Sequence, residues 1–249
     1  MMAENVIEVK KVSKSFGGVK ANIGITMSVK KGSITGIIGP NGCGKSTLFN
    51  SIVGYHPIDI GSIKFDGQEI SHLRVGEIAR LGMLRTFQQT RIYTKMDCVD
   101  NMQISVSQRP GSSSTMFASR KGEIRERAEN LLEFVGLYSK RSLISGDLSF
   151  GQQKLLEFAM ALMNEPKVLL LDEPTAGINP TLINGLINRL QRANEELGIT
   201  LCVIEHNMRV IMNLASHIYC LSNGKMLADG KPQKLRNDPR VVDAYLGGH

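Results

Sequence analysis

Alternating hydrophobic and polar residues mark two stretches near the start of the chain, at 6–10 and 25–29. This alternation predicts half-buried β-strands, and a less polar stretch at 33–39 predicts a strand buried on both faces. Residues 45–53 then have the pattern of a helix, with Gly54 as its stop. The first part of the chain therefore predicts strands that lead into a strand–helix junction.

The middle of the chain, from about residue 74 to residue 165, has few strand signals. Apolar residues recur at helical spacing from Ile124 to Val135, and Gly136 follows as a helix stop. Residues 108–115 are rich in serine and include Pro110 and Gly111, which predicts a loop. We therefore expect a mainly helical region here.

The last third alternates between strand and helix patterns. Short apolar runs at 167–172 and 199–204 flank a helical stripe of apolar residues at 182–193. Asn223-Gly224 lies between two further strand patterns and predicts a hairpin, and a terminal helix begins near Asp238. Strands that alternate with helices predict an α/β fold with a parallel sheet.

The composition supports a globular domain. Hydrophobic residues make up 42% of the 249 residues, enough for one α/β domain or two small domains. No run approaches the roughly 18 apolar residues of a membrane span, and the start of the chain lacks a secretion signal. The four cysteines lack the close pairing of zinc or disulfide frameworks. We expect a soluble, reduced, cytosolic chain.

The net charge of +7 is concentrated in the first half of the chain. Residues 1–125 hold 17 Lys/Arg and 9 Asp/Glu, whereas residues 126–249 hold 13 and 14. A basic half indicates an anionic partner such as a nucleotide, a nucleic acid or lipid headgroups. The alternative is a solvated surface without a partner.

A glycine-rich segment follows the buried strand and fits G-x-x-x-x-G-K-[ST]. It consists of Gly39, Pro40, Asn41, Gly42, Cys43, Gly44, Lys45, Ser46 and Thr47. Glycines let backbone N–H groups turn toward phosphate oxygens, and the helix that follows directs its positive end at them. Lys45 is expected to reach the β- and γ-phosphates and Ser46 to ligate Mg²⁺. The alternative is a glycine-rich turn without a ligand.

A second motif, residues 169–173, is an apolar run that ends in Asp172 and Glu173. A carboxylate at a strand end can hold the metal, so Asp172 is a candidate metal ligand. Glu173 is then placed to polarise the attacking water. Together with the phosphate loop, this motif predicts binding and hydrolysis of a nucleoside triphosphate.

Several further segments resemble the motifs of ABC-type ATPases. Leu148-Ser149-Phe150-Gly151-Gln152 resembles their signature, Gln88 their Q-loop glutamine, and His206 their switch histidine. Residues 176–180 correspond to the D-loop, and Phe16 lies where an aromatic ring stacks on adenine. The resemblance covers nearly the whole chain.

This resemblance implies a P-loop NTPase fold. Its parallel core sheet is RecA-like, with an N-terminal antiparallel β subdomain and an inserted α-helical subdomain. The expected ATPase domain spans 6–240, with the helical subdomain at about 90–158 and a C-terminal helix and tail at 238–249. The implied cofactors are ATP and Mg²⁺, and the metal ligands are Ser46, Gln88 and Asp172. Glu173, His206 and Lys45 are the implied catalytic residues.

ABC-type ATPases act as head-to-tail dimers, so Ser149, Gly151 and Gln152 are expected to face the nucleotide of a second subunit. The segments at 14–18, 78–82, 85–88, 176–180 and 237–247 are most similar to the ATP-binding subunits of branched-chain amino acid importers. The family then implies a homodimer or a heterodimer with a paralogue, transmembrane permease subunits and, indirectly, a solute-binding protein. It also implies a peripheral location on the cytoplasmic face of the cell membrane.

Three positions add hypotheses of their own. Phe150 replaces the second glycine of the signature, and Asn179 stands where many relatives have aspartate. Cys43 lies at a helix N-terminus, which is expected to lower the pKa of its thiol and to make the ATPase sensitive to alkylation.

The surplus of basic residues near Gln88 is interpreted as a docking surface for permeases, made of Arg74, Arg80, Arg85, Arg91 and Lys95.

Other functions remain as alternatives. Related ABC systems import urea or amides or export lipids or polysaccharides. A soluble ABC-type protein acting on ribosomes or DNA usually has two cassettes or a long coiled coil, and this chain has neither, so no nucleic acid partner is expected. A small-molecule kinase or GTPase would lack the segment at 148–152.

Overall fold

The computed structural model describes residues 4–86, 92–106 and 116–246. The chain divides into two compact units. The first unit contains Met1–Arg85, Lys167–Thr175 and Leu190–His249, and the second contains Thr86–Pro166 and Ala176–Arg189. Helix α6, Pro180–Leu197, contributes residues to both units.

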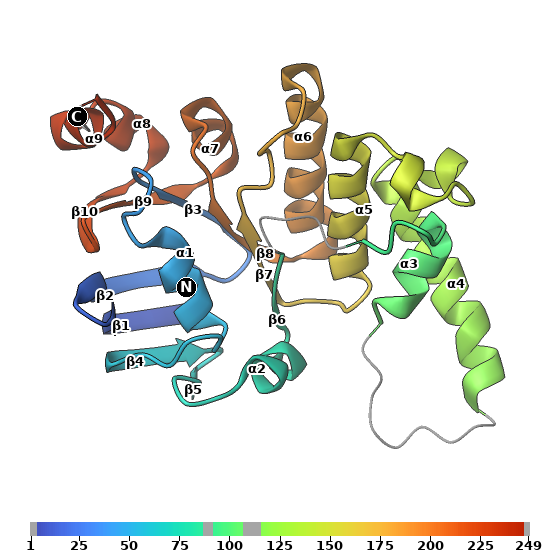
Figure 1. The fold of residues 1–249 in the computed structure, drawn as a ribbon, viewed down its shortest axis with the longest axis horizontal. Helices are drawn as coiled ribbons and strands as arrows, with labels where there is room; N and C mark the ends of the chain where they lie inside the picture. Colours follow the sequence, from blue (N-terminus) through green and yellow to red (C-terminus); the bar gives the residue numbers. More distant parts are fainter. Residues whose placement is uncertain (1–3, 87–91, 107–115, 247–249) are drawn as a thin grey trace. The chain divides into compact units, whose positions relative to one another are not determined.

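One sheet of the first unit is antiparallel, with the strand order β2-β1-β4-β5 (Figure 1). Its strands are β1 (Asn5–Phe16), β2 (Val19–Lys30), β4 (Ile60–Phe65) and β5 (Gln68–Glu69). The strands predicted at 6–10 and 25–29 are confirmed but are longer than the alternation indicates. They extend because β1 and β2 keep pairing, across bulges, to their shared turn, where Phe16 lies opposite Val19.

The second sheet has the order β10-β9-β3-β8-β7-β6, and its neighbouring strands are parallel except for β10 and β9. Its strands are β3 (Ile34–Ile38), β6 (Met83–Arg85), β7 (Val168–Asp172), β8 (Thr200–Ile204), β9 (His217–Ser222) and β10 (Lys225–Gly230). The predicted hairpin is confirmed, since Asn223-Gly224 joins β9 to β10. The α/β prediction with a parallel sheet is therefore correct.

Strands β3, β8 and β7 lie side by side at the centre of this sheet, and every residue in them is buried. Full burial explains why their sequences are continuous apolar runs rather than alternating ones. Because the three strands are parallel, their carboxyl ends meet at one edge of the sheet. This edge carries the residues that the motifs single out.

Strand β6 corrects the sequence interpretation of the middle region. Met83–Arg85 pairs with β7 in parallel, although few strand signals and mainly helices are expected between 74 and 165. Three residues are too few to produce a recognisable period, so only the pairing with β7 defines this strand.

Helix α1 (Lys45–Ile52) belongs to the core that the two sheets share. Its Leu48, Phe49 and Ile52 are fully buried in the same apolar cluster as residues of β1, β2, β7 and β8. The other helices of the first unit are α2 (Val75–Leu81), α7 (Met208–Leu214), α8 (Pro232–Arg236) and α9 (Pro239–Leu246).

The second unit is helical over the residues that the structure describes. It contains α3 (Cys98–Ile104), α4 (Met116–Phe134), η1 (Tyr138–Lys140), η2 (Ser145–Asp147), α5 (Phe150–Leu162) and the first part of α6. The helical stripe predicted up to Val135 is confirmed, with Leu132 and Val135 fully buried. The loop predicted at 108–115 lies outside the described residues. Within the described part of the chain, no helix is both long and apolar enough to cross a membrane.

Candidate active site

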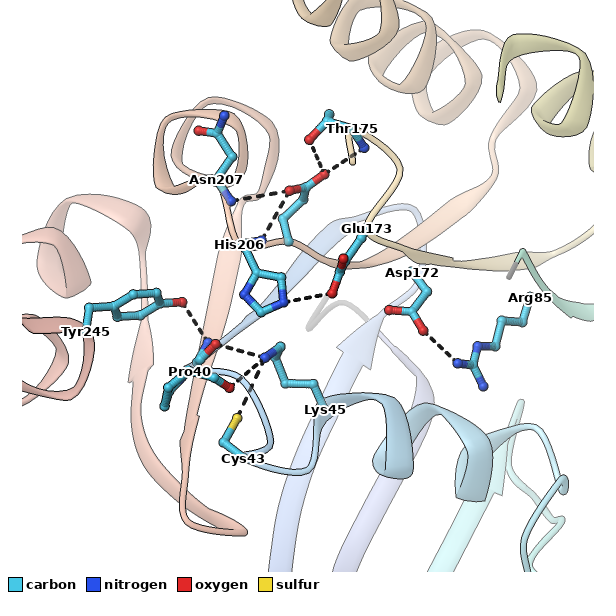
Figure 2. Close-up of polar contacts among 12 residues, drawn as sticks. Pro40, Cys43, Lys45, Arg85, Asp172, Glu173, Thr175, His206, Asn207 and Tyr245 are labelled. Atoms are coloured by element: carbon cyan, nitrogen blue, oxygen red, sulfur yellow. Dashed lines mark hydrogen bonds and ion pairs between the residues drawn. The ribbon is translucent and has the colours of Figure 1, made fainter. Parts of the chain in front are cut away.

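The phosphate loop, residues 39–47, connects β3 to α1 in the first unit. Asp172 ends β7, Glu173 follows it, and Glu205 and His206 follow β8. Because β3, β8 and β7 are neighbours, these segments lie together at the carboxyl edge of the sheet, as Figure 2 shows. Motifs that are more than 100 residues apart in the sequence therefore form one site.

Two glycines of the loop are required by its close packing. Gly39 has φ +147°, and a Cβ there would lie 2.2 Å from the carbonyl oxygen of Leu221. Gly44 has φ +103°, and a Cβ there would lie 2.2 Å from the carbonyl oxygen of Ala21. Side chains at these positions would collide with backbone, so the loop keeps its path only with glycine.

Three contacts from distant elements hold the backbone of the loop. Asn22 on β2 donates from Nδ2 to the Gly44 carbonyl at 3.0 Å. The Gly224 N–H donates to the Cys43 carbonyl at 3.1 Å. The Tyr245 hydroxyl of α9 accepts a hydrogen bond from the Gly39 N–H at 2.7 Å. The sequence analysis did not identify Asn22 or Tyr245, because no local motif marks a side chain that contacts a loop so far away in the sequence.

Lys45 is buried and its ammonium group lies among the loop's own carbonyl groups. Nζ donates to the carbonyl oxygens of Gly39 at 2.8 Å and Pro40 at 2.9 Å. Helix α1 begins at Lys45, and its first turn has no acidic residue and no side-chain cap. The positive end of the helix and the ammonium group therefore face the same loop, which favours an anion.

Cys43 differs from the sequence hypothesis. Its side chain is buried, and its Sγ lies 3.8 Å from the Lys45 Nζ. Burial raises the pKa of the Cys43 thiol, and the opposing effect of Lys45 is smaller. The expectation of a lowered pKa is therefore wrong, because removal of the thiolate from water outweighs the nearby positive charge.

Asp172 forms a buried ion pair with Arg85. Its Oδ2 lies 2.7 Å from the Arg85 Nη2, and both side chains are less than one-tenth exposed. Arg85 also donates to the Asn50 side chain on α1. The interpretation of Arg85 as part of an exposed docking surface is therefore wrong, since its position at the end of β6 directs it into the site. Of the other members of that surface, Arg91 lies outside the described residues, and Arg74, Arg80 and Lys95 are exposed.

The residues present fit a magnesium ion. Asp172 Oδ1 is buried, and no hydrogen bond from the described part of the chain reaches it. Ser46 is exposed in the first turn of α1. A carboxylate oxygen and a hydroxyl oxygen are the ligands that Mg²⁺ prefers. Gln88, the third predicted ligand, lies outside the described residues.

Glu173 and His206 contact each other directly. The His206 Nε2 lies 2.7 Å from the Glu173 Oε1, with the side chains 35% and 17% exposed. Glu173 has φ +51°, an uncommon conformation for a residue other than glycine. Such backbone conformations cluster at functional sites, because the surrounding structure has to enforce them. The two residues predicted to be catalytic thus form a pair.

Glu205 is a buried residue that the sequence analysis missed. Its Oε1 accepts hydrogen bonds from the Thr175 N–H at 2.9 Å and the Thr175 Oγ1 at 2.6 Å. Its Oε2 accepts from the backbone N–H groups of His206 and Asn207. Glu205 therefore joins the loop after Glu173 to the loop that carries His206. Thr175, His206 and Asn207, which donate these hydrogen bonds, are labelled in Figure 2.

Phe16 lies at the end of β1 with 43% of its surface exposed. The His56 ring contacts it edge-on, with the ring centroids 5.1 Å apart, and the Lys14 Nζ lies 5.3 Å from the Phe16 centroid. An exposed ring of this kind is available for stacking, and its predicted contact with adenine stays a prediction.

The signature segment, residues 148–152, lies in the second unit, where Ser149 caps helix α5. The Gln152 N–H donates to the Ser149 Oγ, and the Gln152 Oε1 accepts from the Ser149 N–H, which forms a capping box. Ser149 is exposed, whereas Gly151 is buried against Ile178 and Leu182. The predicted contacts of Ser149, Gly151 and Gln152 with a second subunit's nucleotide stay predictions.

The two departures from the family pattern have structural explanations. Phe150 is 47% exposed, and its ring covers Gly177, where a Cβ would lie 2.8 Å from the ring. Asn179 accepts hydrogen bonds from the Thr181 N–H and Oγ1 in the first turn of α6. An amide oxygen is sufficient for this capping role, so the start of α6 does not require a carboxylate at position 179.

The parallel sheet, the glycine-rich loop between β3 and α1, and the carboxylates after β7 define a nucleoside triphosphatase of the P-loop class. The sequence profile of the ABC transporter family matches residues 23–176. A second profile, for branched-chain amino acid ATP-binding cassette transporters, matches residues 225–249.

Two curated relatives cover almost the full chain. The high-affinity branched-chain amino acid transport ATP-binding protein BraF of Pseudomonas aeruginosa is 35% identical over 99% of both chains. The probable branched-chain amino acid transport ATP-binding protein LivG of Archaeoglobus fulgidus is 37% identical over 97% of this chain and 95% of the relative.

Solved structures agree with this similarity. The ADP conformation of an ATP-binding cassette of an ABC transporter has a TM-score of 0.86 at 35% identity, covering 98% of this chain and 99% of the other. A dimeric bacterial ABC transporter cassette has a TM-score of 0.77 at 26% identity, covering 91% and 98%. This chain belongs to the ABC transporter family and is an ATPase subunit of that type.

Proposed function

We propose that the chain is the ATP-hydrolysing subunit of an importer for branched-chain amino acids. The full-length similarity to branched-chain amino acid transport ATP-binding proteins supports this function. The match of residues 225–249 to a profile of branched-chain amino acid cassettes supports it independently.

The observation that carries the proposal is the meeting of four groups at the ends of three neighbouring strands. Lys45 begins α1 after the loop that follows β3, Asp172 ends β7, Glu173 follows Asp172, and His206 follows β8. Hydrolysis of a triphosphate requires a cation for the phosphates, a metal ligand and a base for the water. This set of side chains provides each of them.

In the proposed complex, the ATP phosphates lie in the phosphate loop. The Lys45 ammonium then exchanges the neutral carbonyl oxygens of Gly39 and Pro40 for charged phosphate oxygens, which form stronger hydrogen bonds. Backbone N–H groups of residues 42–47 and the start of α1 add further donors. Phe16 stacks on the adenine ring.

We assign Mg²⁺ to Ser46 and Asp172, with Gln88 as the third ligand. When bound, the ion neutralises charge on the phosphate oxygens. Arg85 bonds the Asp172 Oδ2, whereas Oδ1 has no hydrogen bond from the described part of the chain, so Oδ1 would be the oxygen that holds the ion.

Glu173 acts as the base. It accepts a proton from water while the water oxygen bonds to the γ-phosphorus, and the bond to the β–γ bridging oxygen breaks to release ADP and phosphate. With Glu173 ionised, the His206 Nε2–H donates to Oε1 and fixes the carboxylate in place.

One chain has one phosphate loop and one signature segment, so we propose hydrolysis by a head-to-tail dimer. Ser149, Gly151 and Gln152 of one subunit would then complete the nucleotide site of the other. The second subunit is another copy of this chain or a paralogue. We assign the ATPase domain to 6–240, its helical subdomain to about 90–158, and the remainder to a C-terminal helix and tail at 238–249.

The transporter context completes the proposal. Permease subunits would supply the membrane-spanning part, a solute-binding protein would deliver the substrate, and this chain would act peripherally at the cytoplasmic face. Its basic first half is assigned to phosphate binding and to contact with permeases, with no nucleic acid partner.

Reconstitution tests the substrate. The chain is purified by affinity from native membranes together with its associated permeases and inserted into liposomes that contain ATP. The proposal predicts ATP-dependent uptake of leucine, isoleucine and valine when the solute-binding protein is added, and no uptake by a Glu173→Gln complex. ATP-dependent uptake of urea alone, or copurification with permeases of a lipid exporter, would contradict the substrate assignment.

A further inference from the structure

Helix α9 reaches the phosphate loop through one side chain. The Tyr245 hydroxyl accepts a hydrogen bond from the Gly39 N–H at 2.7 Å, although the two residues are 206 positions apart. Figure 2 shows Tyr245 directed at the loop, next to Pro40. Tyr245 also lies within residues 225–249, the segment that matches the profile of branched-chain amino acid cassettes.

Gly39 connects Tyr245 to the phosphate-binding lysine. Its N–H donates to Tyr245, and its carbonyl oxygen accepts from the Lys45 Nζ at 2.8 Å. These groups lie on the two sides of the Gly39 φ rotation, which has the unusual value of +147°. The hydrogen bond to Tyr245 therefore fixes the amide side of the Gly39 N–Cα bond. Rotation about this bond changes the direction of the Gly39 carbonyl group, which accepts from Lys45.

The sequence of α9 positions this tyrosine. Val241 is 2% exposed and lies four residues before the half-buried Tyr245, so the two side chains are on the same face of the helix. Asp238 precedes the helix and accepts a hydrogen bond from the Arg240 N–H at 3.0 Å. Burial raises the pKa of Tyr245 to about 12, so the hydroxyl remains neutral in the physiological range.

Removal of the hydroxyl would leave the Gly39 N–H without this acceptor inside the protein. Gly39 is buried, so water does not replace the lost hydrogen bond. An unpaired buried N–H then destabilises this conformation of the loop. The contacts of Cys43 and Gly44 still hold the other end of the loop. The loss of the Tyr245 hydrogen bond would therefore loosen Gly39, the first residue of the loop.

We propose that Tyr245 is a positioning residue for the phosphate loop, through which helix α9 sets the affinity of the site for MgATP. This role rests on the proposed ATPase function of the same site. It gives the C-terminal segment a task in nucleotide binding.

The test compares Tyr245→Phe with a matched control, Tyr219→Phe. The Tyr219 hydroxyl also bonds backbone groups, the N–H and carbonyl of Ser28 at 3.1 and 3.0 Å, but it joins β9 to β2. Both changes remove one hydroxyl that bonds to backbone, so general destabilisation affects both. Val241→Ala serves as a second variant. It keeps the Tyr245 hydroxyl group but weakens the packing of α9, which holds that hydroxyl against Gly39.

We expect Tyr245→Phe to raise KM for MgATP, and the Kd of a fluorescent ATP analogue, by about fivefold, the size of one hydrogen bond of about 1 kcal/mol. kcat should stay within about twofold. Val241→Ala should shift KM in the same direction, and Tyr219→Phe should leave it unchanged. Equal KM values for wild type, Tyr245→Phe and Val241→Ala would overturn the role of Tyr245. A wild-type chain that neither binds nor hydrolyses ATP would overturn the proposed function and this role together.

Discussion

The Glu205 carboxylate holds together the two loops that carry Glu173 and His206. Four hydrogen bonds end on its two oxygens, and its donors are the Thr175 N–H and hydroxyl and the backbone N–H groups of His206 and Asn207. Glu205 is 2% exposed, so water does not substitute for it. We propose that it positions the Glu173–His206 pair, because it bonds the loops that carry the two residues and not the pair itself.

We expect Glu205→Ala to lower the free energy of unfolding by about 3 kcal/mol, because it leaves several buried donors without an acceptor. kcat should fall at least tenfold, while KM for MgATP changes little because the phosphate loop is intact. Thermal unfolding and steady-state ATPase assays measure both effects.

The Thr175 bond provides the matched control for this prediction. Thr175→Ser keeps the hydroxyl donor and should retain wild-type kcat, whereas Thr175→Val removes it and should lower kcat. Wild-type kcat in both Glu205→Ala and Thr175→Val would show that the bridge has no part in turnover.

Cys43 provides a prediction about pH. Since its pKa is raised, the thiolate fraction at neutral pH is smaller than for an ordinary thiol of pKa about 8.5, and the alkylation rate should still be rising above pH 9. The rate of iodoacetamide labelling of Cys43, followed by mass spectrometry from pH 6.5 to 10, measures this. Glutathione is the reference for an exposed thiol, and Cys43→Ala identifies the modified site. Labelling of Cys43 at pH 7 as fast as that of glutathione would refute the raised pKa.

At the scale of elements, the start of helix α5 packs against a glycine in the loop between β7 and α6. The Phe150 ring covers Gly177, which has φ +74°. Gly198 has a similar φ of +69°, but a Cβ there would meet no atom within 4 Å. Alanine at either position costs about 1 kcal/mol of backbone strain, and at Gly177 the added methyl also collides with the ring.

We therefore predict that Gly177→Ala lowers the free energy of unfolding by about 1 to 2 kcal/mol more than Gly198→Ala does. Urea unfolding of the two variants measures the difference. The excess should disappear when Phe150→Ala is combined with Gly177→Ala, because the colliding ring is then absent. An excess that persists in the double variant would mean that Phe150 is not the cause.

Elements with a strong local pattern were predictable from the sequence. The buried strands β3, β7 and β8 are continuous apolar runs, and the Asn223-Gly224 turn marks the hairpin of β9 and β10. Strand β6 was missed because three residues carry no period, and its existence depends on pairing with β7.

At the scale of the whole molecule, the candidate site also divides into residues that a local sequence pattern marks and residues that only the fold brings there. Lys45, Asp172 and Glu173 were predictable because their motifs are local and chemically specific. Tyr245, Asn22 and Glu205 were not, because each acts through a backbone group of a distant or neighbouring loop, and many side chains satisfy such a requirement. Arg85 was misinterpreted as a surface cation, since its sequence neighbours do not reveal that the end of β6 faces Asp172.

The central claim about the whole molecule is ATP hydrolysis by a dimer with Glu173 as the base. Its most direct test is the ATPase rate and the MgATP-dependent mass of purified Glu173→Gln, measured by light scattering, against wild type and the exposed control Glu195→Gln. The account predicts that Glu173→Gln loses hydrolysis by on the order of 10²-fold or more, keeps ATP binding and accumulates as a dimer, while Glu195→Gln behaves as wild type. A Glu173→Gln chain that hydrolyses ATP within about threefold of wild type and remains monomeric with MgATP would contradict it, since a lost general base costs at least about 10²-fold.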